Sequence, residues 1–183
     1  MKRIWISGYR SYELGIFNDK DPKLAVIKYL IKRELKIAIE DGLNWVITGP
    51  QMGIEQWSLE CAVDLKKDYP ELQIAMMMPF ANFGSQWNEN NRMKLNDLIA
   101  KVDFVGKVSE EEYQSPQQLK NFQSFMLNHT DGAILIYDDE HEGKSEFDLE
   151  AIRKFQETAD YSLRLIDFYE LQDAAEEYAE INN

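Results

Sequence analysis

The strongest structural signal in the chain lies in residues 44–57, which read Asn44-Trp45-Val46-Ile47-Thr48-Gly49-Pro50-Gln51-Met52-Gly53-Ile54-Glu55-Gln56-Trp57. The run ending at Thr48 is typical of a buried strand, the two glycines mark a turn, and a helical pattern begins at Ile54. A strand, a glycine turn and a helix together direct backbone N–H groups and the positive end of the helix dipole at one point. The segment therefore predicts a site for an anion such as a phosphate or a carboxylate.

A second strand and turn of the same kind opens the chain as Ile4-Trp5-Ile6-Ser7-Gly8-Tyr9-Arg10. This turn adds an aromatic ring and a guanidinium group, which binds phosphate oxygens through two parallel hydrogen bonds. The alternative role for Arg10 is a surface ion pair with Glu13. Two such turns on one parallel sheet suggest a nucleotide-like ligand.

Short apolar runs alternate with helical patterns along the whole chain. Strands are expected at 3–6, 44–48, 73–78, 132–137 and 161–166, with a weaker sixth at 104–108. Nearly continuous apolar strands indicate burial on both faces. The alternation predicts an α/β fold, a Rossmann-like, doubly wound and mostly parallel sheet of about five to six strands with helices on both faces. We expect a single domain over residues 1–183, with 167–183 as an acidic helical tail.

The composition excludes several classes of function. A net charge of −13 repels nucleic acid and anionic membranes, so neither is expected as a partner. The single cysteine, Cys61, excludes an internal disulfide and a zinc site built on cysteines. No leader sequence is expected because the chain begins on a strand, and these features together predict a cytoplasmic location.

Each residue of the candidate site has a structural alternative. The loop from Gly49 to Gly53 could be a tight turn that packing requires, and it matches neither the dinucleotide-binding nor the P-loop fingerprint. Glu55 could compensate the helix dipole, or it could hold ribose hydroxyls or act as an acid or base. Trp57 is expected in the core.

Other motifs carry weaker signals. The run Glu142-Gly143-Lys144-Ser145 is rejected as a P-loop because acidic residues precede it. The two histidines, His129 and His141, are far apart in the sequence, and no metal site is expected. An aromatic cluster after the third strand either clamps a base or covers the pocket, or it is a hydrophobic lid under a loop; its members are Phe80, Phe83 and Trp87.

The two glycine turns, with Pro79-Phe80, residues 113–116 and residues 131–138, resemble the YpsA family of Gram-positive bacteria over about Arg3 to Ile166. The resemblance implies membership of the SLOG superfamily of Rossmann-like proteins, with the DprA and LOG groups, and binding of a nucleotide-derived ligand. It implies these ligand-site residues: Gly8, Tyr9, Arg10, Gly49, Gln51, Gly53 and Glu55. The LOG hydrolase loop is replaced here by acidic residues, and DprA-like DNA binding conflicts with the net charge.

We therefore expect a module that binds a nucleotide or nucleotide-derived metabolite for regulation or sensing. One alternative is a hydrolase acting on a nucleotide N-glycosidic or phosphate bond, with Glu55 as its best catalytic candidate. The other is a protein-interaction adaptor with a vestigial pocket. The sequence leaves unknown the cofactor, the ligand, any protein partner and whether the chain forms a homo-oligomer.

Overall fold

The computed structural model describes residues 1–183 and contains one six-stranded sheet in which every strand is parallel to its neighbours. The strands are β1 (Arg3–Gly8), β2 (Trp45–Thr48), β3 (Gln73–Met78), β4 (Phe104–Lys107), β5 (Gly132–Ile136) and β6 (Ser162–Ile166). Their order across the sheet is β4-β3-β2-β1-β5-β6. The predicted Rossmann-like sheet is confirmed, including the weak strand at 104–107.

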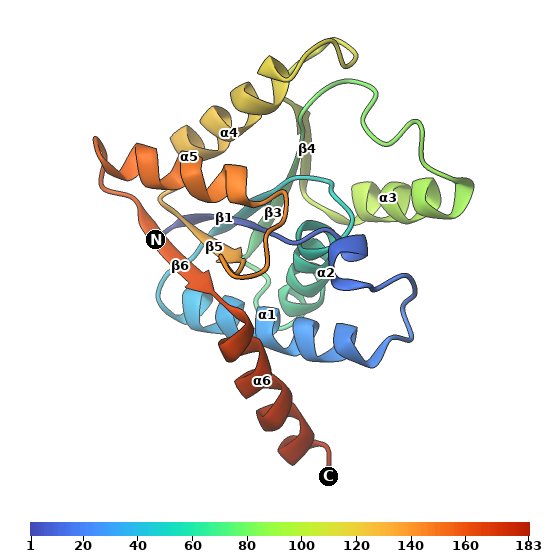
Figure 1. The fold of residues 1–183 in the computed structure, drawn as a ribbon, viewed down its shortest axis with the longest axis vertical. Coiled ribbons are helices and arrows are strands. Elements are labelled where there is room, and N and C mark those ends of the chain that lie inside the picture. Colours follow the sequence, from blue (N-terminus) through green and yellow to red (C-terminus); the bar gives the residue numbers. More distant parts are fainter.

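Helices cover both faces of the sheet (Figure 1). They are α1 (Pro22–Glu40), α2 (Ile54–Lys66), α3 (Glu89–Lys101), α4 (Gln117–His129), α5 (Glu146–Gln156) and α6 (Phe168–Ile181), with a short 3-10 helix, η1, at Ser11–Leu14. The chain runs outward from β1 to β4 and then returns past β1 to β5. Strand order therefore reverses beside β1, and ligands of such sheets bind near this reversal, at the carboxyl ends of the strands.

Helix boundaries follow the capping residues. Asp21 caps α1 by accepting a hydrogen bond from the Lys23 N–H at 3.0 Å, and Pro22 occupies the first helical position. Helix α3 was not predicted, because only Leu95 and Leu98 of its thirteen residues are buried and its apolar stripe is weak. A polar helix of this kind is hard to recognise from periodicity alone.

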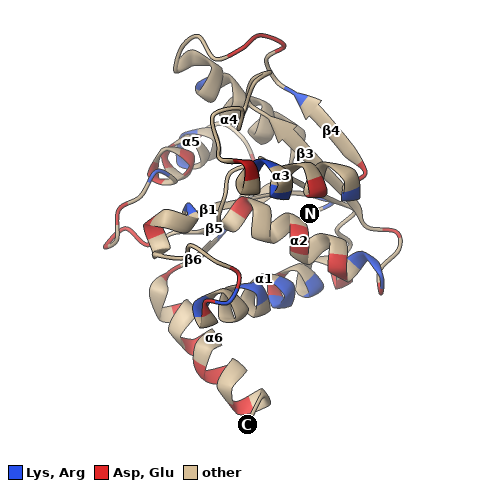
Figure 2. Cartoon of the chain, turned by 90° about the vertical axis from the view of Figure 1, so that its right-hand side faces the viewer, with Lys and Arg blue, Asp and Glu red and all other residues tan.

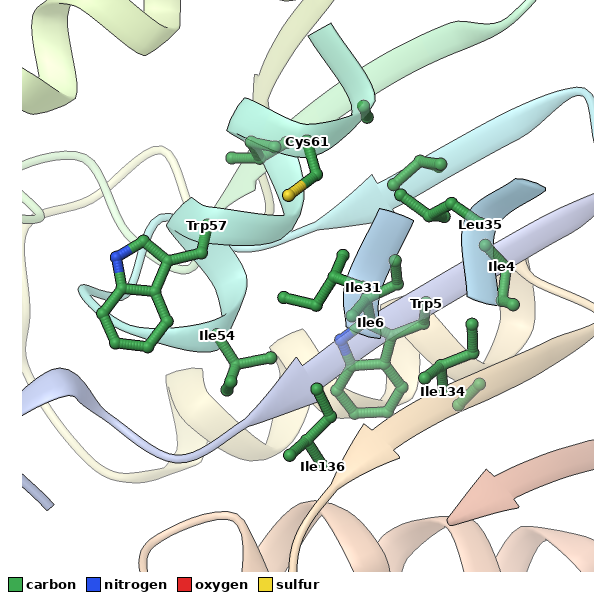
Figure 3. Close-up of a cluster of buried hydrophobic side chains, with 14 of the residues drawn as sticks. Ile4, Trp5, Ile6, Ile31, Leu35, Ile54, Trp57, Cys61, Ile134 and Ile136 are labelled. Atoms are coloured by element: carbon green, nitrogen blue, oxygen red, sulfur yellow. The ribbon is translucent and has the colours of Figure 1, made fainter. Parts of the chain in front are cut away.

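The main core lies between the sheet and the α1–α2 layer. Figure 3 shows side chains of β1, β5, α1 and α2 meeting in one apolar cluster that includes Ile4, Ile31 and Ile134. Trp57 lies at the margin of this cluster. It is 7% exposed, so the expectation that it belongs to the core is correct.

Most basic side chains of α1 are paired with acids on neighbouring helices, and Figure 2 shows the two signs of charge facing one another there. Lys28 lies 2.7 Å from Glu60 on α2, and Arg33 lies 2.7 Å from Glu177 on α6. These contacts tie the acidic α6 to the α1 layer, although exposed ion pairs add little stability individually.

The loops that follow β1 and β2 are joined backbone to backbone. Arg10 and Gly53 form an antiparallel bridge, the Ser11 N–H donates to the Met52 carbonyl at 3.1 Å, and the Ile54 N–H donates to the Tyr9 carbonyl at 3.0 Å. This confirms the expectation that the two glycine turns meet at one edge of the sheet. Gly53 has φ of +116°, and a Cβ there would collide with the Tyr9 carbonyl and lie 2.6 Å from the Ser11 nitrogen.

We predict that Gly53→Ala destabilises the protein more than Gly42→Ala does. The two glycines share a positive φ, +116° and +104°, but a Cβ at Gly42 meets nothing within 4 Å. Gly42→Ala should therefore cost only backbone strain, about 1–2 kcal/mol, and Gly53→Ala should add a further cost of about 1–3 kcal/mol from the steric clash. Urea unfolding measures both free energies, and equal losses would contradict the geometry.

Candidate functional site

Polar side chains from three elements converge at the carboxyl ends of β1 and β2. Arg10 follows β1, Glu55 lies in the first turn of α2, and Asp148 lies in the first turn of α5. An Arg10 Nη1 atom lies 3.9 Å from the Glu55 carboxylate and donates to the Gly8 carbonyl at 3.3 Å. The ion pair of Arg10 with Glu13, the alternative role for this arginine, is not formed. The Glu13 carboxylate instead accepts backbone N–H groups of Arg10 and Lys144, at 2.7 and 2.9 Å.

Glu55 is buried beneath the glycine loop, at 4% exposure. Burial raises the pKa of its carboxyl group from 4.5 to about 7. The positive charge of Arg10 opposes this rise, the negative charge of Asp148 adds to it, and backbone hydrogen bonds at Gln51 and Gly49 oppose it. The backbone N–H groups of the glycine loop thus favour the ionised form of the Glu55 carboxyl group.

Asp148 was missed by the sequence reasoning. Its two carboxylate oxygens accept hydrogen bonds from Ser7 Oγ at 2.6 Å and from Gln123 Nε2 at 2.8 Å. Burial raises its pKa as well, against the lowering effect of these two hydrogen bonds and of Arg10. The one sequence signal was an acidic residue in the first turn of a helix, which normally indicates only dipole compensation.

Gly49 and Gln51 form the loop that covers Glu55. A Cβ on Gly49 would collide with the Glu55 carboxylate and lie 3.0 Å from the Phe122 ring of α4. The absence of a side chain at position 49 therefore lets the Glu55 carboxylate and the α4 helix approach the loop backbone. Gln51 accepts a backbone hydrogen bond from Gln56, which closes the first turn of α2.

Tyr9 and Gly8 make buried contacts that fix the position of the chain beside the cluster. Tyr9 is buried, and its hydroxyl donates to the His141 carbonyl at 2.7 Å and accepts the Asp138 N–H at 2.9 Å. Burial raises the pKa of this hydroxyl to about 12. A Cβ on Gly8 would lie 2.7 Å from the Ile136 carbonyl and 2.8 Å from the Ile54 side chain. Glycine at the end of β1 therefore lets the start of α2 pack directly against this strand.

The structure assigns plain structural roles to two other motifs. The Asp138 carboxylate accepts the N–H groups of Glu140 at 2.9 Å and Phe168 at 3.0 Å, which lowers its pKa. Ser145, from the rejected P-loop run, donates its hydroxyl to the Gly8 carbonyl at 2.5 Å.

The aromatic residues after β3 pack on one another. The Phe80 ring lies 5.4 Å from Phe83 and 5.1 Å from Tyr113, and the Phe83 ring lies 5.3 Å from Trp87. The Ala81 N–H also donates to the Glu111 carbonyl at 2.9 Å. These contacts join the two loops that follow β3 and β4.

No helix in the structure has the length and apolar character needed to cross a membrane. No group of three or more His, Cys, Asp and Glu side chains is arranged to hold a metal ion. Two hollows of about 280 and 290 Å³ lie outside the polar cluster. The first is bordered by η1, α2 and α3, and the second lies on the β2–β4 part of the sheet.

Comparison with known proteins identifies the family. A model of YpsA, described as the YspA SLOG family, matches residues 4–171. Similar proteins include the UPF0398 protein of Pediococcus pentosaceus, 59% identical over 98% of both chains, and that of Limosilactobacillus reuteri, 56% identical over 98% of this chain and 96% of its own. The UPF0398 protein of Lactiplantibacillus plantarum is 55% identical over 100% of this chain and 97% of its own. These matches confirm the resemblance noted in the glycine turns, and the chain belongs to the YpsA family of SLOG proteins.

Proposed function

We propose that this protein binds a nucleotide or nucleotide-derived metabolite at the cluster formed by Arg10, Glu55 and Asp148, as a regulatory or sensing module. The observation that carries the proposal is the convergence of these three side chains from three different elements at the point where strand order reverses. A cluster of ionisable side chains that includes a buried acid, Glu55, is costly to fold, and such groups concentrate at functional sites. Membership of the SLOG family supports a nucleotide-related ligand.

The charges in the cluster match different parts of such a ligand. Arg10 is the cation of the cluster, and its guanidinium suits a phosphate group. Glu55 and Asp148 supply carboxylate oxygens, which accept hydrogen bonds from sugar hydroxyls. We assign ligand contact to the side chains of Arg10, Glu55 and Asp148 and to the backbone of Gly49 and Gln51.

The other residues that the family resemblance implies are assigned an indirect role and no contact with the ligand. Gly8, Tyr9 and Gly53 shape the loops that hold the charged side chains, through the contacts described above. Substitutions at these three residues should affect ligand binding together with folding. Substitution of Arg10 helps to separate the two effects, because the Arg10–Gly53 junction is made by main-chain atoms and does not need the arginine side chain.

A hydrolase remains the second candidate because of Glu55. A carboxyl group with a pKa of about 7 can both donate and accept a proton near neutral pH, as a general acid or base requires. Release of a base or phosphate from nucleoside monophosphates or ADP-ribose, abolished by Glu55→Gln, would establish the enzyme in place of the sensor.

We predict that Arg10→Ala weakens binding of the ligand by about 1.5–3 kcal/mol, the value of a charge-assisted hydrogen bond. The ligand is first identified by mass spectrometry of small molecules released from protein purified under native conditions, and its affinity is then measured by calorimetry. Arg153→Ala, which removes an exposed arginine of α5, is the control and should leave the affinity unchanged. An unchanged affinity in Arg10→Ala would remove the case for a phosphate site, and no bound nucleotide at all would favour the adaptor.

We predict that Glu55→Gln makes stability less dependent on pH. The folded-state pKa of Glu55 is raised from 4.5 to about 7, so the native state binds more protons than the unfolded state between these values. The free energy of unfolding of the wild type should therefore fall as pH rises through this window, by on the order of 3 kcal/mol from this group. Urea unfolding at pH 5 and pH 8 should show a smaller fall in the variant. The same fall in both proteins would contradict a buried carboxyl group.

A further inference from the structure

The hollow bordered by η1, α2 and α3 has features of a binding site and is separate from the charged cluster. It has a volume of about 280 Å³ and lies between the segment 11–19, the start of α2 and α3. Neither Arg10 nor Glu55 nor Asp148 lines it. The loop junction at Gly53 forms part of its wall.

Aromatic and apolar side chains supply six of the fourteen residues that line the hollow. Tyr12 and Phe17 come from the segment after β1, and Met52 and Trp57 come from the loop and helix after β2. Phe17 is 77% exposed, although a large apolar ring gains free energy when it is covered. Rings and a methionine around a small hollow are suited to a flat aromatic ligand, because such ligands stack on their faces.

Two polar atoms in this wall have no partner in the chain. Gln56 is 5% exposed, and its Nε2 donates to the Pro50 carbonyl at 2.9 Å, which fixes the amide and leaves Oε1 without a hydrogen bond. The indole N–H of Trp57 also makes no hydrogen bond. Only two side-chain polar atoms are both fully enclosed and without a hydrogen-bond partner, the Trp5 Nε1 and the Ser58 Oγ. The Gln56 Oε1 and the Trp57 Nε1 are not among them, so both retain some exposed surface.

The charged groups of the wall are already paired. Asp19 lies 3.3 Å from Lys94 across the hollow, from the segment after η1 to α3, and Glu60 lies 2.7 Å from Lys28. No free cation remains to hold a phosphate. The wall therefore suits an uncharged ligand.

From these contacts we propose that the hollow binds an uncharged planar heterocycle of the nucleobase class. The Gln56 Oε1 accepts a hydrogen bond from the edge of the ring, and the Trp57 N–H donates one to it. Phe17 and Tyr12 cover the ring. This site goes beyond the proposed function, because it uses no residue of the charged cluster and needs no phosphate.

The test uses the full-length protein and four probes, adenosine, guanosine, cytidine and uridine, titrated by saturation-transfer NMR. We expect saturable binding of at least one nucleoside. Phe17→Ala and Trp57→Phe should each weaken it by roughly fivefold or more, the loss expected for one stacking ring or its hydrogen bond. Tyr169→Ala removes a similarly exposed ring, 74% exposed on α6, and should leave binding unchanged.

Arg10→Ala separates this proposal from the preceding one. Nucleoside binding should survive in that variant, whereas binding at the charged cluster should not. The proposal is overturned if none of the four nucleosides binds, if neither Phe17→Ala nor Trp57→Phe weakens binding, or if Arg10→Ala abolishes it. Binding of nucleoside monophosphates alone, dependent on Arg10, would overturn this proposal and support the proposed function.

Discussion

The backbone junction between Arg10 and Gly53 is the constraint on which the functional edge of the molecule depends. Two backbone hydrogen bonds form the bridge that joins the loops after β1 and β2, and the junction requires a residue with φ of +116° and no side chain at position 53. A residue other than glycine at that position would separate the loops. At this junction Arg10 lies 3.9 Å from Glu55, and Met52 and Trp57 line the neighbouring hollow.

The charged cluster shows how a protein can occupy its own anion site. The loop N–H groups, the helix dipole and Arg10 all favour a negative charge, and Glu55 supplies one from within the chain. Burial nevertheless raises its pKa to about 7, so burial outweighs those favourable contacts. A second acid, Asp148, lies close enough to raise that pKa further. A ligand that brings a phosphate near Arg10 would therefore favour the protonated form of Glu55, which couples binding to proton uptake.

The two proposed sites differ in the chemistry that they recognise. The cluster presents one cation and two acids, with hydrogen bonds from Ser7 and Gln123 holding Asp148 in place. The hollow presents aromatic rings and an amide, with its charges already paired. Paired charges attract an anion far less than a free cation does. Phosphate and sugar are therefore assigned to the first site and a bare heterocycle to the second.

Local patterns were enough to predict the alternation of strands and helices and the two glycine turns on one parallel sheet, because apolar runs act within a few positions. Helix α3 escaped because its two buried leucines form too weak a stripe. Glu55 and Arg10 were predicted from their places after strands. Asp148 was not predicted, because it lies on α5 and is separated in the sequence from its partner Ser7 by 141 positions. The two residues come together only when the chain folds. Whether a polar residue is buried, and which acid faces which base, depends on packing between distant segments. Only the tertiary structure decides this, because desolvation and distance set the strength of every charge interaction.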